Sequence, residues 1–185
     1  MNPFDWCWAV WLLIWLALSF RNKHTARREN LSSWTLHMLP IMLAAVLLAA
    51  DWTPWPALQR EVLPYRAAWY WIGLALTAGG LAFTVWARVY LGTNWSGSVQ
   101  VKTDHALVRS GPYQWVRHPI YTGLLAAFFG SGLAMDQWLS MIAFVTVLAG
   151  LWYKLGLEER WMTETFGDAY RDYRNHSKAL IPWIL

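Results

Sequence analysis

The sequence predicts an all-α integral membrane protein with about five transmembrane helices, and three observations support this prediction. Of its 185 residues, 57% are hydrophobic and only 14% are charged, whereas soluble domains contain about 25% charged residues. Five apolar segments alternate with polar connections along the chain. Sixteen tryptophans are present, many of them near the ends of these segments, where an indole ring can meet both hydrocarbon and water.

The five apolar segments differ in length, but each approaches the roughly 20 helical residues that cross a hydrocarbon layer. Their limits are residues 6–20, 34–50, 68–91, 120–135 and 138–157. Only Asp136 and Gln137 separate the last two, so we expect these to form a tight antiparallel hairpin. Gly79 and Gly80 in the third segment would allow close helix contact or a kink, because glycine lets two backbones approach.

The length of the chain is typical of one domain, and we expect residues 1–185 to form a single membrane domain. No basic stretch precedes the first apolar segment and no small-residue cleavage site follows it. We therefore interpret this segment as a span rather than a signal peptide. The single cysteine, Cys7, excludes an internal disulfide and a metal cluster built from cysteines, and we expect no metal centre.

The basic residues lie almost entirely on one side of the predicted membrane. Thirteen of the fifteen lysines and arginines fall in residues 21–28, 88–117 and 154–178, whereas the 51–66 connection holds only Arg60 and Arg66. Cytoplasmic loops carry the excess of Lys and Arg. We therefore expect the N-terminus outside, and the C-terminus and any active site in the cytosol. The net charge of +4 thus indicates membrane orientation rather than binding to nucleic acid.

The densest group of polar residues lies just before the fourth apolar segment, in LVRSGPY (107–113) and RHPIYTG (117–123). Pro119 suits the first position of a helix, so the N–H groups of the next three residues should be unpaired. Flanked by the donors His118 and Tyr121, such a helix start can bind a carboxylate or phosphate. The alternative is that the Arg-His-Pro sequence merely anchors the span at the membrane interface.

Two adjacent acids, Glu158 and Glu159, directly follow the fifth apolar segment. The predicted hairpin would return them to the level of His118 and Tyr121. Acids so close to lipid are costly without partners and are commonly functional. The alternative is a structural salt bridge between one of these acids and Arg117.

Three aromatic residues near the C-terminus, Phe166, Tyr170 and Tyr173, share one helix face with spacing i, i+4, i+7. We expect a short interfacial helix whose aromatic face is turned toward the membrane or the site. Alternatively, this helix only packs over the hairpin.

Together these blocks resemble the isoprenylcysteine carboxyl methyltransferase family, which belongs with the phospholipid methyltransferases. In order, they are HALVRSGPY (105–113), RHPIYTG (117–123), the acidic pair, FGxxYxxY (166–173) and LIP (180–182). The resemblance covers about residues 88–183 and is that of a short, prokaryotic-type member, while residues 1–67 carry no motif. The G-x-G-x-x-G fingerprint of a soluble nucleotide-binding fold does not occur in the sequence.

The resemblance implies a pocket for S-adenosylmethionine at the cytosolic end of the hairpin. The cofactor contacts that it implies are Gln100, His105, Ala106, Leu107, Val108, Tyr113, His118, Pro119, Ile120, Tyr121, Glu158 and Glu159. The family's prenyl-substrate enzymes have an arginine four residues before the cofactor-binding glutamate, whereas this sequence has Lys154. A lysine keeps the positive charge without the bidentate geometry of a guanidinium, which puts the identity of the acceptor in question.

The implied function is transfer of a methyl group to a lipophilic acceptor, in the first place the carboxylate of an isoprenylcysteine-like or prenylated substrate. We expect Arg117 or Lys154 to hold that carboxylate, which is already ionised, so that alignment and exclusion of water suffice. Methylation of an amine on a phospholipid headgroup is an alternative, in which His105, His118 or Glu159 would act as the base. An NADPH-dependent membrane reductase and a non-enzymatic membrane scaffold are further alternatives.

Overall fold

Six α-helices and one two-stranded sheet form the described part of the chain, which is residues 2–19, 25–50, 53–64, 67–102 and 106–184 of the computed structural model. The helices are α1 (Pro3–Ser19), α2 (Leu31–Ala49), α3 (Ala67–Leu91), α4 (Pro119–Met135), α5 (Trp138–Phe166) and α6 (Asp168–His176). The strands are β1 (Thr25–Arg28) and β2 (Gln100–Lys102), and short 3-10 turns cover Pro56–Gln59, Gly92–Asn94 and Gly111–Gln114.

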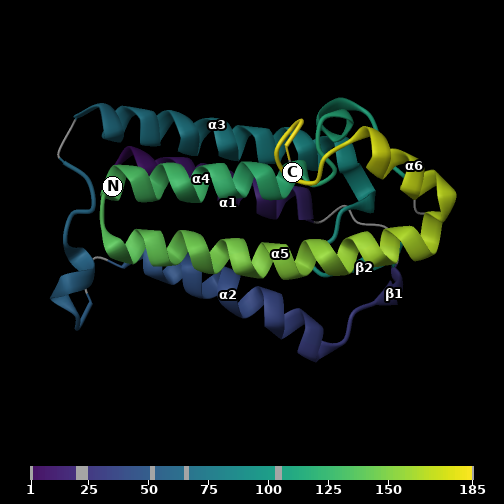
Figure 1. Cartoon of the computed structure of the whole chain (residues 1–185), viewed down its shortest axis with the longest axis horizontal. Helices are drawn as coiled ribbons and strands as arrows, with labels where there is room; N and C mark the ends of the chain where they lie inside the picture. Colours follow the sequence, from purple (N-terminus) through teal and green to yellow (C-terminus); the bar gives the residue numbers. More distant parts are fainter. Residues whose placement is uncertain (1, 20–24, 51–52, 65–66, 103–105, 185) are drawn as a thin grey trace.

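Five apolar helices, α1 to α5, run side by side along the long axis of the molecule (Figure 1), which confirms the predicted all-α membrane fold. Helices α2, α3 and α5 are long and apolar enough to cross a membrane, and α1 and α4 are shorter apolar helices of 17 residues each. Helix α5 continues to Phe166 instead of ending near residue 157. Glu158 and Glu159 therefore lie within a helix and not after one.

Helices α3 and α4 approach closely because glycines lie where they cross. A Cβ atom at Gly80 would lie 2.5 Å from the carbonyl oxygen of Gly123, and one at Gly130 would lie 2.6 Å from that of Gly73. Both distances are far below van der Waals contact, so only glycine fits. The helix contact predicted for Gly80 is confirmed, whereas Gly79 faces open space.

Helices α4 and α5 form the tight antiparallel hairpin that the sequence predicts. Asp136 turns the chain in a left-handed conformation with a φ of 51°, and Gln137 caps the start of α5 through reciprocal bonds with Ser140. The Asp136 carboxylate accepts hydrogen bonds from the backbone N–H groups of Val62 (3.2 Å) and Leu63 (2.9 Å). The connection between α2 and α3 is thereby tied to the tip of the hairpin.

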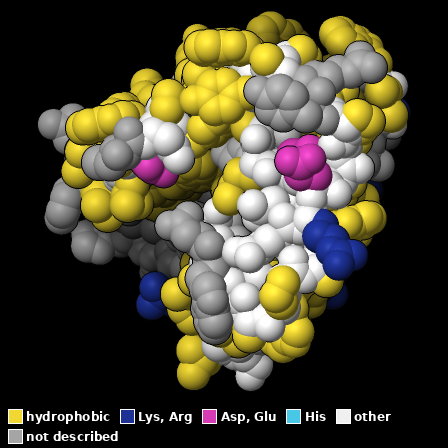
Figure 2. Space-filling model, turned by 90° about the vertical axis from the view of Figure 1, so that its left-hand side faces the viewer, with side chains coloured by type: hydrophobic (Ala, Val, Ile, Leu, Met, Phe, Trp, Pro, Cys, Tyr) yellow, Lys and Arg dark blue, Asp and Glu magenta, His cyan; other side chains and the backbone are white. Residues whose placement is uncertain are grey.

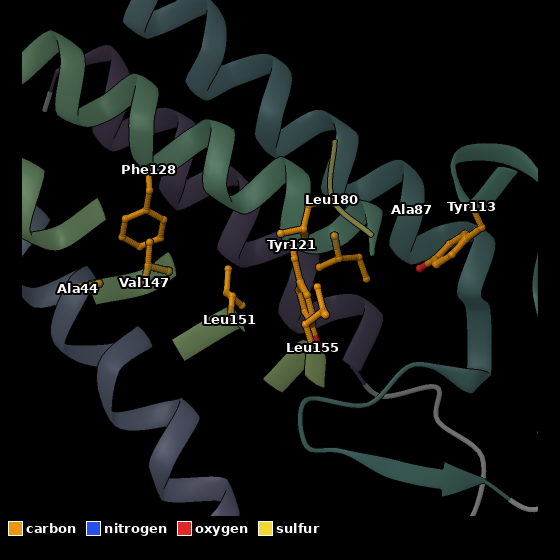
Figure 3. Packing of buried hydrophobic residues seen from close by; sticks show 10 residues of the cluster. Ala44, Ala87, Tyr113, Tyr121, Phe128, Val147, Leu151, Leu155 and Leu180 are labelled. Carbon is orange, nitrogen blue, oxygen red and sulfur yellow. The ribbon is translucent and has the colours of Figure 1, made fainter. Parts of the chain in front are cut away.

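The hydrophobic core is built around the hairpin, with contributions from α2, α3 and the C-terminal tail. In Figure 3, Phe128 and Tyr121 point from α4 toward α5, where Val147 and Leu151 are buried, and Ala44 of α2 meets them from the other side. The rings of Phe128 and Tyr121 and these aliphatic residues thus pack α4 against α5 along the hairpin. This packing positions the end of the hairpin that lies away from its turn.

The β1–β2 ribbon was not predicted from the sequence, because strands of four and three residues are too short to give a visible alternation. The strands pair antiparallel and join the α1–α2 connection to the segment that follows α3. Arg27 of β1 lies 2.8 Å from the Glu164 carboxylate and 4.1 Å from the Trp161 ring, both on α5. The ribbon is therefore held against the polar extension of α5.

The two ends of the helix bundle differ in composition. One end carries the N-terminus, residues 53–64 and the hairpin tip, and the other carries the ribbon, α6 and the C-terminal tail (Figure 1). Figure 2 shows the first end, where hydrophobic and uncharged side chains predominate. The ends are thus distinguished by the same uneven distribution of basic residues that the sequence contains.

Candidate functional site

A cavity of about 350 Å³ lies at the end of the bundle where α4 begins. Residues from all six α-helices line it, together with residues 94–99 and 106–108 from the long connection between α3 and α4. Helices that are far apart in the sequence therefore line the same cavity. The hairpin region supplies polar groups to it, among them His118, Lys154 and Glu158.

The centre of the site is the contact between the start of α4 and the acidic pair on α5. Nδ1 of His118 lies 3.4 Å from the Glu158 carboxylate, and Nε2 lies 3.2 Å from that of Glu159. The imidazole stacks on the ring of Tyr121, with ring centres 5.2 Å apart and planes 7° from parallel. The hairpin brings the acids beside His118 and Tyr121, as the sequence predicts.

Both ring nitrogens of His118 are directed at the two acids. Burial lowers the pKa of His118, but hydrogen bonds and charges from Glu158 and Glu159 outweigh burial and raise this pKa above its ordinary value. Both ring nitrogens face carboxylates, so the protonated form is favoured. The N–H of Thr122 also has a partner, the carbonyl of His118 at 3.0 Å, so it is not one of the unpaired donors expected at this helix start.

The two acids have different surroundings. Glu159 has a 2.6 Å contact with Nε of Arg117 and a 3.1 Å contact with Nε of Arg174, in addition to His118. It does not line the cavity, whereas Glu158 does. The Glu158 side chain is 23% exposed and that of Glu159 is 10% exposed. The structural salt bridge considered as an alternative thus describes Glu159, and Glu158 is the acid that faces the cavity.

The C-terminal tail closes one side of the site. The backbone N–H groups of Arg117 and His118 donate to the carbonyls of residues 178 and 179, at 2.8 and 3.0 Å. The Thr122 hydroxyl donates to the carbonyl of Leu180 at 2.6 Å. These bonds fix the segment before α4 from outside, so the position of His118 depends on the tail as well as on the hairpin.

The aromatic residues of α6 face the site, which decides between the two interpretations of this helix. Tyr170 and Tyr173 are buried and line the cavity, while Phe166 is the last residue of α5. The Tyr173 hydroxyl donates to the backbone carbonyl of Tyr113. Burial raises the pKa of Tyr173 to about 12 and also raises that of Tyr113. These phenols are therefore neutral at physiological pH and offer ring faces and uncharged hydroxyls.

Lys154 is buried on α5, one helical turn before Glu158. Its Nζ donates to the carbonyl of Gly97 at 2.7 Å and lies 5.7 Å from the centre of the Tyr121 ring. Residues at i and i+4 on a helix can form an ion pair, yet Glu158 pairs with His118 instead. The cavity thus contains an acid and an amine that are close but directed to separate partners.

Nearly all the predicted site residues that the structure describes lie on the cavity wall. These are Ala106, Leu107, Val108, Tyr113, Arg117, His118, Pro119, Ile120, Tyr121, Lys154 and Glu158. Glu159 lies behind the wall. His105 and the side chain of Gln100 lie outside the described residues.

The first two helices contribute to the site although residues 1–67 carry no recognisable motif. Trp11 and Trp15 of α1 and Met38 and Ile41 of α2 line the cavity, and the ring of Trp15 meets that of Trp95 at 5.3 Å. Their helical spacing is a signal of a shared face. Apolar residues in a span nevertheless give no sign of whether that face meets lipid, another helix or a cavity.

Comparison with known proteins identifies the family. A family model described as phospholipid methyltransferase matches residues 68–169, more than half of the chain. The chain belongs to the phospholipid methyltransferase family. This result agrees with the resemblance seen in the sequence motifs, and the match includes α3, the hairpin and the start of α6.

Individual relatives match most of the length of this chain. Methanethiol S-methyltransferase 1 of Bradyrhizobium diazoefficiens is 27% identical, over 93% of this chain and 66% of its own length. Protein-S-isoprenylcysteine O-methyltransferase of Dictyostelium discoideum is 24% identical, over 95% of this chain and 73% of its own. The solved eukaryotic intramembrane Ras methyltransferase, an isoprenylcysteine carboxyl methyltransferase, superposes with a TM-score of 0.58 and 26% identity. That match covers 84% of this chain and 55% of the larger one.

Proposed function

We propose that this family member is a membrane methyltransferase that moves a methyl group from S-adenosyl-L-methionine to a lipophilic acceptor, in the first place the carboxylate of an isoprenylcysteine-like molecule. The observation that carries the proposal is one cavity that contains both an acidic side chain, Glu158, and a buried amine, Lys154. The carboxylate can bind a positively charged group of one ligand, and the amine can bind a negatively charged group of another. The names of the relatives support the same reaction class.

The residues of the cavity fit the cofactor chemically. Glu158 can accept hydrogen bonds from ribose hydroxyls or from an ammonium group. The neutral rings of Tyr113 and Tyr170 suit a sulfonium, a contact worth about 0.5–2 kcal/mol. Ile120 and Tyr121 lie in the first turn of α4, and the start of a helix favours a carboxylate. A carboxylic acid, aromatic faces and a helix start are thus available on one wall.

The opposite side of the cavity fits an apolar acceptor with an anionic head. Trp11, Trp15 and Met38 supply apolar surface from α1 and α2, and Lys154 supplies the positive charge. The Gly97 carbonyl and the Tyr121 ring are the groups near its Nζ. An acceptor carboxylate would therefore meet an amine that makes no ion pair among the described residues.

When bound, the cofactor supplies an electrophilic methyl group on a sulfonium sulfur. An ionised acceptor carboxylate could take that methyl group with the sulfur as the leaving group, so the residues of the cavity would not need to move a proton. Lys154 would orient the acceptor, Glu158 would orient the donor, and the buried rings would exclude water. Alignment of this kind can supply up to about 7–11 kcal/mol. Arg117 and Glu159 act indirectly, by fixing His118.

The test is methyl transfer from labelled S-adenosylmethionine by the detergent-purified protein. N-acetyl-S-farnesylcysteine should become labelled with a base-labile methyl ester, while the methyl ester of the same compound, which has no free carboxylate, should not. If only phosphatidylethanolamine became labelled, the acceptor group would be an amine and not a carboxylate. Absence of transfer to all acceptors, or stabilisation by NADPH but not by S-adenosylhomocysteine, would refute the proposal.

A small thiol is a second candidate acceptor, because one of the relatives is a methanethiol S-methyltransferase. The lysine at position 154 also lacks the bidentate fork with which an arginine holds a carboxylate. A thiol must lose its proton before it attacks, so its methylation rate should increase with pH. The product would be a thioether that resists mild base, which separates it from an ester in the same assay.

We further propose that the N-terminus is outside, that the cavity and the C-terminus are cytosolic, and that the membrane is a bacterial or archaeal inner membrane. The excess of basic residues at the cavity end supports this orientation. Within a single domain, residues 88–183 would hold the cofactor, and α1 and α2 would contribute to the acceptor side.

A further inference from the structure

A buried hydrogen-bonded pair, the Glu29 carboxylate and the His37 imidazole, lies behind the cavity and has no part in the chemistry proposed above. Glu29 follows β1 and His37 lies on α2, and their exposed fractions are 8% and 0%. Nε2 of His37 is 3.0 and 3.1 Å from the two carboxylate oxygens. Neither residue lines the cavity. A buried carboxylate is costly unless hydrogen bonds satisfy it, so the donors around Glu29 show which parts of the chain it holds together.

Glu29 fastens the segment of residues 97–99 to the start of α2. Its Oε1 accepts the backbone N–H of Val99 at 2.7 Å, and its own N–H donates to the carbonyl of Val99 at 3.1 Å. The Ser33 hydroxyl donates to Oε2 at 2.8 Å. One residue of the segment is therefore held by two opposed hydrogen bonds, and each carboxylate oxygen has at least two partners.

The same segment holds Lys154. The carbonyl of Gly97, two residues before Val99, accepts the hydrogen bond from Nζ of Lys154 at 2.7 Å. Helices α2 and α5 also touch at this level, since a Cβ at Gly150 would lie 2.9 Å from the carbonyl oxygen of His37. Gly150 is one helical turn before Lys154. A continuous path of contacts thus runs from the Glu29–His37 pair through residues 97–99 to the amine in the cavity.

We propose that Glu29 and His37 are positioning residues that fix the 97–99 segment, so that Nζ of Lys154 stays where the acceptor carboxylate binds. The inference rests on the proposed function, in which Lys154 receives that carboxylate. A lysine side chain is long and flexible. Without the Gly97 carbonyl in place, the ammonium would turn away or pair with Glu158 one turn further along α5. The affinity for the acceptor would then fall, whereas the affinity for the cofactor would change little.

The kinetic test compares Glu29→Ala, Glu29→Gln and a control, Thr77→Val. Thr77 is fully buried between α3 and α4, where its hydroxyl lies 3.1 Å from that of Ser131, and it does not line the cavity. We expect Glu29→Ala to raise the KM for N-acetyl-S-farnesylcysteine about tenfold or more, with little change in the KM for S-adenosylmethionine. Glu29→Gln should restore most of the loss, because its amide oxygen can still accept the Val99 N–H. Thr77→Val should lower only the thermal stability.

A second measurement reports on the segment without any activity. Amide hydrogen exchange of the peptide that contains residues 96–99 should be about tenfold faster in Glu29→Ala than in the wild type, and unchanged in Thr77→Val. Unchanged exchange in Glu29→Ala, or an equal rise of both KM values, would overturn the inference while leaving the proposed function intact. A wild-type protein that methylates no acceptor would instead overturn the proposed function, and the acceptor role of Lys154 with it.

Discussion

The adjacent residues Glu158 and Glu159 have different surroundings. Glu159 is surrounded by His118, Arg117 and Arg174, which makes it the junction between the start of α4, α5 and α6. Glu158 contacts His118 but also faces the cavity. One acid therefore stabilises the site, and the other is available to a ligand.

This difference predicts unequal effects on stability. Glu159→Ala leaves Arg117 and His118 without their shared carboxylate, and removal of one partner from a buried ion pair costs about 3–5 kcal/mol. The control is Glu164→Ala, which removes the exposed pair with Arg27 and should cost less than about 1 kcal/mol. Thermal unfolding in detergent measures both. Equal losses in the two variants would show that Glu159 is not the junction described above.

Lys154 predicts a change in acceptor specificity. Lys154→Met keeps the volume and removes the charge, so the KM for a carboxylate acceptor should rise by about 10- to 100-fold, the effect of losing a charge-assisted contact of about 1.5–3 kcal/mol. Lys154→Arg should retain most of the activity, since it keeps a positive charge. Kinetics with a carboxylate acceptor and with a neutral thiol test this, and an equal effect on both acceptors would contradict it.

His118 predicts a pH-dependent stability. Because its folded-state pKa is raised above the ordinary value of 6.5, its protonation stabilises the folded state fully below pH 6.5. That contribution is lost as the pH rises through the folded-state pKa. The difference in Tm between the wild type and His118→Gln should therefore be largest at low pH and should shrink at alkaline pH. A difference that grows with pH would show that the buried ring is neutral.

At the level of elements, the hairpin of α4 and α5 determines the geometry of the site, and α3 braces it through the glycines. Gly80→Ala would place a Cβ 2.5 Å from the Gly123 carbonyl oxygen, and overpacking of this kind costs about 1–3 kcal/mol. Its neighbour provides the matched control, because Gly79 has open space around it and Gly79→Ala should stabilise the helix by up to about 1 kcal/mol. Thermal unfolding of the two variants should shift in opposite directions. A shift of the same sign and size would show that the crossing is looser than described.

The same elements show what the sequence could predict. The hairpin was predictable because only two residues separate two apolar segments, and its closure places His118 beside the acids. The extension of α5 was not, because the residues after 157 are polar and end the apolar pattern while the helix continues. The ribbon was too short to detect. Which acid faces the cavity was also hidden, because the two acids are adjacent in the sequence and one partner of Glu159, Arg174, comes from α6.

For the molecule as a whole, helices without a motif complete a site whose motifs lie elsewhere. Trp11 and Trp15 of α1 line the cavity built around the hairpin. Glu29 and His37 lie behind it, where Glu29 accepts the backbone N–H of Val99 in the cavity wall. A membrane enzyme that joins a polar donor to an apolar acceptor needs both kinds of surface in one cavity. The α4–α5 end supplies the polar groups, and the first two helices supply apolar wall.

The most direct test of this account is calorimetric binding of S-adenosylhomocysteine to the purified protein. The wild type should bind one molecule, and Glu158→Gln should weaken binding by about tenfold or more, as expected for the loss of a charge-assisted hydrogen bond of about 1.5–3 kcal/mol. Lys154→Met should bind it nearly as well as the wild type, since that residue is assigned to the acceptor. Failure of the wild type to bind, or binding that Glu158→Gln leaves unchanged, would contradict the account.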